Sequence, residues 1–179
     1  MKHSATKFCT CNLTVAIISS LLLIFPLSKV MTAQQAAPAV LSATQLPRVV
    51  PTSFYFDGQA APTQMRNAAA ARFGPKRYVI AALVDTSGYS AEVRARYEGF
   101  LITDSQIRIG GAELRPGAYG FGFTEAGKLN IFDVGGNQVL SVNAADDKAM
   151  RRPRPLMMQQ AGEGVRLYSG RRYVVISAK

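Results

Sequence analysis

Glycine-containing turn signals divide the second half of this chain into short apolar runs, and this regular punctuation constrains the fold more than any other feature. Gly110 and Gly111 lie between "IRI" and "AEL", and other glycines interrupt "TEAGKL", "DVGGNQV", "QAGEGVRL" and "YSGRRY". A glycine pair between two strand-like runs suits a primed hairpin turn. Frequent turns between short runs are typical of an antiparallel sandwich or barrel. The sequence therefore predicts an all-β domain, an antiparallel β-sandwich or partly open barrel of about seven to nine strands.

Three longer runs carry further information about secondary structure. The runs "RYVIAALV", 77–84, and "RYVVISA", 172–178, are apolar at successive positions, which predicts central strands covered on both faces. The run "PTQMRNAAAARFG", 62–74, is the one helical candidate. Ala favours helix, Thr63 is suited to cap its start and Gly74 to end it. An extended path along the sheet is the alternative, because "TQMRN" has little helical periodicity.

Two runs alternate in the manner of half-buried strands. In "EGVRLYSG", we expect Val165 and Leu167 to face the core and Arg166 and Tyr168 to face outward. The run "EVRARYEG", 92–99, alternates in the same way and predicts a strand with one charged, solvated face.

Composition divides the chain into three parts. Residues 1–33 combine early lysines with an apolar run over 13–27 and end at the small residue Ala33, which predicts a cleaved signal peptide. An uncleaved membrane anchor is the alternative. Residues 34–53 hold three prolines and are expected to form a flexible arm or linker. Residues 54–179 have the length of a single β domain.

Several kinds of chemistry are excluded once the signal is removed. Cys9, Cys11 and His3 all lie within it, so the mature chain has neither cysteine nor histidine. Ser-His-Asp and Cys-His catalysis and most catalytic zinc sites need these residues. We therefore expect no metal site and no cofactor, and the sequence favours a non-enzymatic module over an enzyme.

The charge balance indicates the kind of partner. The chain carries 21 Lys and Arg against 11 Asp and Glu, and loss of Lys2, Lys7 and Lys29 leaves 18 against 11, a net charge of +7. A basic protein exported to the periplasm or the cell exterior meets anionic glycans, lipid headgroups and other envelope proteins. The alternative is that the charge serves solubility alone. Nucleic acid is not expected, because no recognised motif for it is present. Contact with a membrane is expected only through an uncleaved signal segment.

The segment "RRPRP" concentrates this charge. Pro153 and Pro155 keep it extended, so it could present its arginines to a ligand. The structural interpretation is a rigid entry to an edge strand, with the acids just before it pairing locally with the arginines. Both interpretations expect exposed arginines. The candidate ligand-binding arginines are Arg151, Arg152, Arg154, Arg171 and Arg172.

The run "PGAYGFGF" supplies another candidate. Tyr119, Phe121 and Phe123 share one face of the expected strand, and Gly120 and Gly122 share the other. One interpretation is an aromatic core face backed by a closely packed neighbour. The other is a flat floor for a ligand, in which Tyr119 contacts that ligand.

Asp85 is the last candidate, in "VDTSGYS". Its neighbours Thr86, Ser87 and Ser90 offer further oxygens, but the spacing does not match a calcium-binding loop. A turn in which these side chains satisfy backbone N–H groups is the alternative.

Several of these segments carry a resemblance. The segment "LRPGAYGFGFTEAGKLNIFDVGG" is similar to a strand followed by a hairpin in uncharacterised secreted bacterial β domains. "VDTSGYS" and "RPRPLMMQ…RLYSGRRYV" resemble segments of a small acidobacterial-type exported family without known activity. The resemblance covers residues 54–179 and consists of turns and core residues. It implies an exported β domain and assigns no catalytic residue and no substrate.

These observations lead us to expect an exported, envelope-associated, non-enzymatic binding or structural module. One alternative is a small glycan hydrolase, which needs two carboxyl groups about 5–9 Å apart. Another is a subunit of an extracellular assembly, in which residues 34–53 supply a strand to a neighbour.

Overall fold

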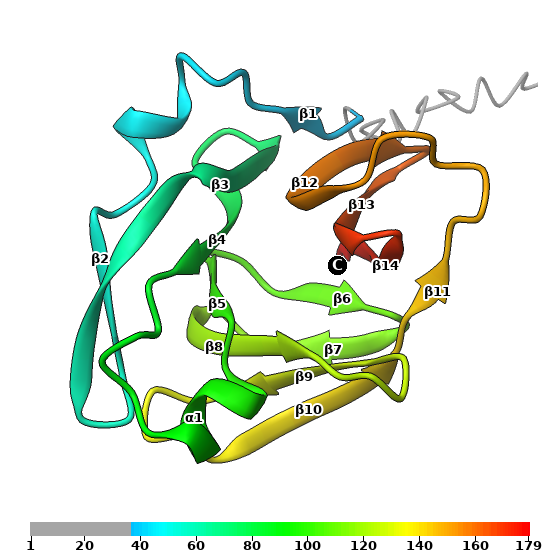
Figure 1. Ribbon diagram of the computed structural model, residues 1–179. Helices are drawn as coiled ribbons and strands as arrows, with labels where there is room; N and C mark the ends of the chain where they lie inside the picture. Colours follow the sequence, from blue (N-terminus) through cyan, green and yellow to red (C-terminus); the bar gives the residue numbers. More distant parts are fainter. Residues whose placement is uncertain (1–36) are drawn as a thin grey trace, which may run out of the picture. The chain divides into compact units, whose positions relative to one another are not determined.

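A computed structural model describes residues 37–179, so the expected signal peptide and residues 34–36 of the expected arm lie outside the described residues. The described chain forms two antiparallel sheets with fourteen strands (Figure 1). The predicted all-β sandwich is confirmed, and its sheets are not closed into a barrel. The expected count of strands was too low, because five strands have four residues or fewer and leave no recognisable alternation.

The larger sheet has eight strands in the order β1-β3-β4-β5-β8-β9-β10, with β2 paired beside β3. Its strands are β1 (Ala39–Val40), β2 (Ser53–Phe56), β3 (Gln59–Gly74), β4 (Arg77–Val84), β5 (Gly99–Thr103), β8 (Gly117–Phe123), β9 (Lys128–Phe132) and β10 (Gln138–Asn143). A 3₁₀ helix, η1 (Leu46–Arg48), precedes β2, and the helix α1 (Ala91–Arg96) lies between β4 and β5.

The smaller sheet has six strands in the order β12-β13-β14-β6-β7, with β11 paired to β14. The β6–β7 turn consists of Gly110 and Gly111 with φ of 55° and 88°, which confirms the predicted primed hairpin. The strands are β6 (Ile107–Ile109), β7 (Ala112–Leu114), β11 (Ala145–Asp146), β12 (Arg154–Ala161), β13 (Gly164–Gly170) and β14 (Arg172–Ala178).

Two hydrophobic cores hold the fold together, one on each face of the larger sheet. The main core lies between the sheets and receives inward residues from both. The second core covers the other face of the larger sheet with η1, β2 and α1. Within residues 37–179, no comparable layer covers the outer face of the smaller sheet, whereas the larger sheet is covered on both faces.

Because of this difference between the sheets, the expectation of burial on both faces is met by β4 in the larger sheet and not by β14 in the smaller sheet. In β4, Val79 and Ala81 enter the main core and Ile80 and Ala82 the second core, as predicted. In β14, the inward residues are buried, but Val175 on the outer face is 43 % exposed. The prediction for β14 was wrong on this point, since an apolar run does not reveal whether a second layer exists.

The helix expected over 62–74 is absent, and these residues belong to the strand β3. Ala69 and Ala71 face the main core, and Ala70 faces the second core. The preference of Ala for helix is worth a few tenths of a kcal/mol per residue over strand-forming types. Pairing with β4 and burial on both faces outweigh so small a preference. Here the alternative of an extended path was correct.

The strand expected over 92–99 is instead the helix α1, followed by the start of β5. Ser90 caps the helix, since its Oγ accepts a hydrogen bond from the Val93 N–H at 3.3 Å. Glu92 lies in the first turn, and Arg94 and Arg96 lie in the last, where they complement the helix dipole. Alternation of charged and apolar residues over so short a run did not distinguish helix from strand.

The aromatic residues of β8 face the main core. Phe121 is fully buried, Phe123 is nearly so, and Tyr119 packs against the same cluster. The structural interpretation of "PGAYGFGF" is therefore the one that the packing supports.

The opposite face of β8 explains its glycines. A Cβ on Gly120 would lie 2.4 Å from the ring of Phe56, and one on Gly122 would lie 2.0 Å from the carbonyl oxygen of Arg96. The absence of side chains lets β2 and α1 approach the sheet closely.

The described residues of the segment expected to form an arm lie along the larger sheet. Ala39 and Val40 pair with β3, and Leu46 and Val50 are buried in the second core. Within residues 37–179, no helix is both long enough and apolar enough to span a bilayer.

Candidate functional site

Five candidate arginines gather at one end of the smaller sheet, and we call them the arginine cluster. Arg154 is the first residue of β12 and pairs with Gly170 at the end of β13. Gly170 directly precedes Arg171 in the chain. The Arg171 Nε donates to the carbonyl oxygen of Met150 at 3.2 Å, which brings it beside Arg151. Arg172 lies opposite Asp146. The cluster thus consists of Arg151, Arg152, Arg154, Arg171 and Arg172 on two adjoining segments.

The cluster is mostly accessible, and none of its arginines forms an ion pair with an acid within residues 37–179. Arg151, Arg152 and Arg154 are exposed, as expected, and so is Arg171, while Arg172 is half-buried and donates to the carbonyl oxygen of Thr124. The three ion pairs found within residues 37–179 involve other arginines and a lysine, with Asp57 or Glu113. The expected pairing of the arginines with the preceding acids is therefore not formed. This leaves a concentration of positive charge that an anion could neutralise.

The chain before the cluster forms a well-anchored loop, residues 147–152. Asp147 is its main anchor: its N–H donates to the Arg171 carbonyl at 2.9 Å. Its carboxylate accepts from the Ala149 N–H at 3.1 Å and from the Tyr168 hydroxyl at 3.0 Å. The Met150 N–H donates to the Asp147 carbonyl at 3.2 Å. Because these bonds hold the backbone on both sides of Asp147, the loop presents its arginines from a defined position.

Two hollows open at the cluster. One, of about 350 Å³, lies beside the loop and is lined by Arg151, Arg152, Met150 and Met157 together with Asp147, Ala149 and Gln159. The other, of about 700 Å³, is wider and shallower, and Arg171 and Arg172 line it with Pro153, Glu125 and Asp146. Both hollows contain both signs of charge, and the narrower one adds the apolar side chains of Met150 and Met157.

Residues on the outer face of the smaller sheet extend the site beyond the sequence prediction. Arg166 and Tyr168 face outward, as predicted, yet Tyr168 is fully buried because the loop lies against its hydroxyl. The Arg166 guanidinium lies 4.6 Å from the ring centroid of Tyr173 and donates to the Tyr168 hydroxyl at 3.4 Å. Alternation in "EGVRLYSG" revealed the direction of these side chains, but no signal in the sequence indicated that a distant loop would cover one of them.

The other two candidates lie apart from the cluster. The Tyr119 hydroxyl donates to the Arg115 carbonyl at 3.0 Å, and burial raises the pKa of Tyr119. Asp85 accepts a hydrogen bond from the Ser87 N–H at 3.0 Å, and this bond lowers its pKa. Neither residue lines either hollow at the cluster. Tyr119 acts in packing, and Asp85 stabilises a turn.

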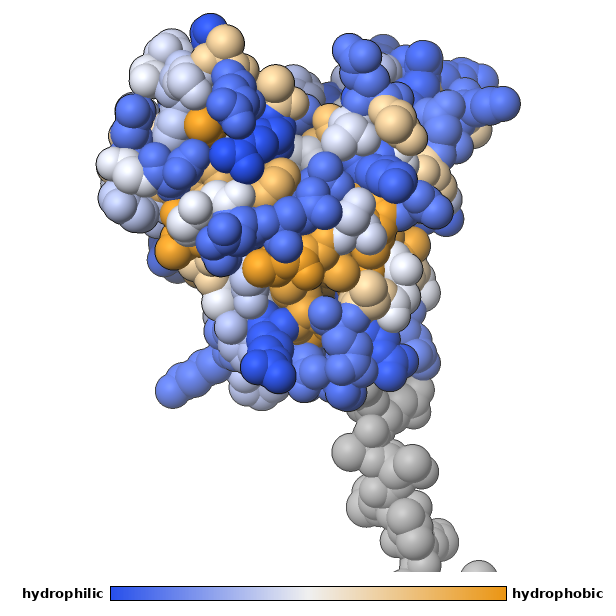
Figure 2. Space-filling view, turned by 90° about the horizontal axis from the view of Figure 1, so that it is seen from below, coloured by the Kyte–Doolittle hydropathy of each residue, from blue (hydrophilic) through white to orange (hydrophobic). Residues whose placement is uncertain are grey.

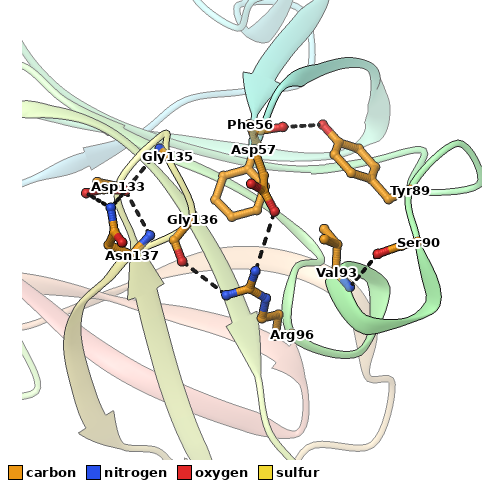
Figure 3. A network of polar contacts seen from close by, with 10 residues as sticks. All are labelled: Phe56, Asp57, Tyr89, Ser90, Val93, Arg96, Asp133, Gly135, Gly136 and Asn137. Atoms are coloured by element: carbon orange, nitrogen blue, oxygen red, sulfur yellow. Dashed lines mark hydrogen bonds and ion pairs between the residues drawn. The ribbon is translucent and has the colours of Figure 1, made fainter.

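A network of polar contacts lies beside the second core, away from the arginine cluster (Figure 3). Arg96, at the end of α1, lies 3.4 Å from the Asp57 carboxylate and donates to the Gly136 carbonyl at 3.1 Å. It also lies 5.6 Å from the ring centroid of Phe132. Tyr89 donates to the Phe56 carbonyl at 3.0 Å. The network joins the β2–β3 turn, α1 and the β9–β10 turn, and so holds the covering layer in place.

More than half of the described acidic side chains are used in structural contacts, either within turns or between segments far apart in the chain. Hydrogen bonds from Asn137 and from the Gly135 N–H hold Asp133 in its turn and lower its pKa. Among the described acids, those bonded in this way are Asp57, Asp85, Asp104, Glu113, Asp133 and Asp147. Acids engaged in turns and caps are poorly placed for catalysis.

Glu98 is the acid with a distinct environment. Burial raises its pKa, while a backbone hydrogen bond from Phe123 and the positive charge of Arg172 act in the opposite direction. It is half-buried beside the cluster rather than exposed in a hollow. No group of three or more His, Cys, Asp and Glu side chains within residues 37–179 is arranged to hold a metal ion.

An apolar surface appears on the face seen from below, where β9 and β10 lie (Figure 2). Val134, in the β9–β10 turn, and Val139, in β10, are 42 % and 48 % exposed. The sequence of β10, "QVLSVN", has no charge, and the exposed Lys128 is the one charged residue of β9, so these two strands do not identify a partner for this surface.

Comparison with protein-family models, with curated proteins and with solved structures finds no match to this chain. The arginine cluster is therefore the feature from which we infer a function.

Proposed function

We propose that this chain is an exported, non-enzymatic module that binds an anionic component of the bacterial envelope through the arginine cluster. The periplasm or the cell exterior is its proposed location, in keeping with the N-terminal signal pattern and the resemblance to secreted β domains. The observation that carries the proposal is the gathering of five arginines on two adjoining segments, with no ion pair to any acid within residues 37–179.

Physical considerations support this use of the cluster. Exposed arginines that repel one another lower stability slightly, and an anionic ligand removes that repulsion. Planar guanidinium groups bind phosphate, sulfate and carboxylate through paired hydrogen bonds. The anchored loop reduces the entropy that would be lost when a ligand binds.

The test compares the purified protein with a variant in which Arg151, Arg152 and Arg154 are replaced by serine. Binding to an acidic polysaccharide and to vesicles of anionic phospholipid is measured at low and high salt. We expect the variant to lose most binding at both salt concentrations. Its melting temperature should change little, because exposed side chains away from structural contacts contribute less than about 0.5 kcal/mol each.

A matched control removes the same charge elsewhere. Arg66, Arg94 and Arg115 are exposed and line neither hollow at the cluster. Their replacement by serine should preserve most of the binding. Equal loss in both variants would show that net charge alone attracts the ligand, and would overturn the proposal.

The two alternatives find less support. A carboxylate hydrolase needs one acid held protonated in a cleft, but Glu125 and Asp146, which share the wider hollow, are both exposed. Strand exchange would require Ala39 and Val40 to leave their pairing with β3 of the same chain. Neither alternative has an observation that favours it over the module.

A further inference from the structure

We infer that the ligand of the narrower hollow is an anionic phospholipid at a membrane surface, with its phosphate between Arg151 and Arg152 and its first methylenes against Met150 and Met157. This inference rests on the proposed function and names its ligand class. It differs from binding of a soluble polyanion, which needs only the charge.

The lining of the hollow carries the inference. Arg151 and Arg152 are exposed, whereas Met150 and Met157, which line the same hollow, are half-buried. A purely polar anion would not contact the two methionines favourably, and a purely apolar ligand would not pair with the two arginines. A phospholipid offers both characters in the same order, since a glycerol diester links its charged phosphate to its apolar chains. Methionine is suited to this contact because its flexible side chain adapts to irregular apolar partners.

Asp147 is the one acid in the lining of the narrower hollow, and it repels an anion less strongly than a free carboxylate would. Both carboxylate oxygens of Asp147 accept hydrogen bonds, one from Ala149 and one from Tyr168. The Tyr168 hydroxyl in turn lies within hydrogen-bond distance of the Arg166 guanidinium. The positive charge of Arg166 therefore offsets Asp147 from the side of the sheet, and the arginines of the loop remain available.

The size and rigidity of the hollow also fit a surface contact. A volume of about 350 Å³ accepts a headgroup and the start of its chains, not a whole lipid molecule. The hydrogen bond from Arg171 to the Met150 carbonyl and the bonds of Asp147 hold the loop in this shape. The lipid would thus be recognised while it remains in the bilayer.

The experiment measures binding of the purified protein to three probes: vesicles of neutral phospholipid, vesicles with anionic phospholipid, and inorganic polyphosphate in solution. Two double variants are compared with the wild type. Replacing Arg151 and Arg152 by serine should weaken binding to anionic vesicles about thirtyfold, from two arginines near a charged surface, and should also weaken binding to polyphosphate. Replacing Met150 and Met157 by serine should weaken vesicle binding about tenfold, from lost apolar burial, and leave polyphosphate binding unchanged.

The outcomes separate the two proposals. Equal binding to neutral and anionic vesicles together with tight polyphosphate binding would overturn the lipid inference and leave the proposed function standing. Absence of binding to all three probes and to an acidic polysaccharide would overturn both. Vesicle binding that the serine substitutions of the methionines do not alter would also overturn the lipid inference. A Met150→Leu/Met157→Leu variant controls for misfolding, since it keeps the apolar floor and should retain the wild-type affinity.

Discussion

The close approach of α1 to β8 predicts that Gly122→Ala destabilises the fold. An added Cβ would lie 2.0 Å from the Arg96 carbonyl oxygen, whereas ordinary contact begins at 3.4 Å, so one backbone segment must move by 1.4 Å. That oxygen belongs to a segment held on both sides. The Tyr97 N–H donates to the Val93 carbonyl at 2.9 Å, and the Glu98 N–H donates to the Phe121 carbonyl at 2.8 Å.

The magnitude follows from these contacts. Overpacking of a rigid core costs about 1–3 kcal/mol, and a weakened backbone hydrogen bond costs about 0.5–1.5 kcal/mol. The lower chain entropy of alanine in the unfolded state offsets about 0.4–1 kcal/mol. We expect a net loss of about 2–3 kcal/mol in the free energy of unfolding. For a domain of this size that loss lowers the melting temperature by about 6–12 °C.

Calorimetry and urea unfolding of Gly122→Ala and of Gly88→Ala check this expectation. Gly88 lies in the loop before α1, and a Cβ there would meet only the Gln59 side chain at 3.8 Å. Its replacement should be neutral or slightly stabilising. A Gly122→Ala protein that melts at or above the wild-type temperature would refute the argument, because it would mean that α1 is free to move away from the sheet.

Three further substitutions test the second core and its surroundings. Phe56→Ala should lower the free energy of unfolding by about 3–5 kcal/mol in urea titrations, because the fully buried ring stacks 4.0 Å from Tyr97. Tyr97→Phe should raise the melting temperature slightly, since its buried hydroxyl has no hydrogen-bond partner within residues 37–179, and a lower melting temperature would contradict this. Glu98→Gln should be more stable than the wild type at neutral pH. Burial raises the pKa of Glu98 in the folded protein, so the wild type loses stability as the pH rises from the ordinary glutamate pKa through the raised pKa. Urea titrations should show that the difference in stability between Glu98→Gln and the wild type disappears at lower pH.

Local pattern was sufficient for much of the fold. The turn at Gly110 and Gly111, the double burial of β4 and the aromatic core face of β8 were all predicted correctly. Each depends on residues that are neighbours in the chain. The prediction of an all-β fold depends on many such segments together, so a wrong prediction for a single element does not change it.

Local pattern failed where two structures compete for one short run. The alanines of β3 favour helix when taken alone, and the alternating residues of α1 resemble a strand. The intrinsic preferences involved are below about 1 kcal/mol per residue. Pairing with β4 decides the first case, and the Ser90 cap with burial of Val93 decides the second.

The candidate site shows the same division. The sequence by itself predicted that Arg151, Arg152 and Arg154 are exposed, because prolines keep their segment at the surface. It could not bring residues 151–154 next to residues 171–172, since that neighbourhood arises from the β12–β13 pairing and from the Arg171 contact with Met150.

The sequence alone thus determined the fold class, much of the alternation of inward and outward residues, and the absence of cysteine and histidine from residues 37–179. Tertiary structure alone decided that the larger sheet has two covered faces and the smaller sheet one. It also decided that a loop lies over Tyr168, and that the two segments bearing the five arginines adjoin. The physical reason is that periodicity reports contacts between near neighbours, whereas layers and charge clusters form between segments far apart in the chain.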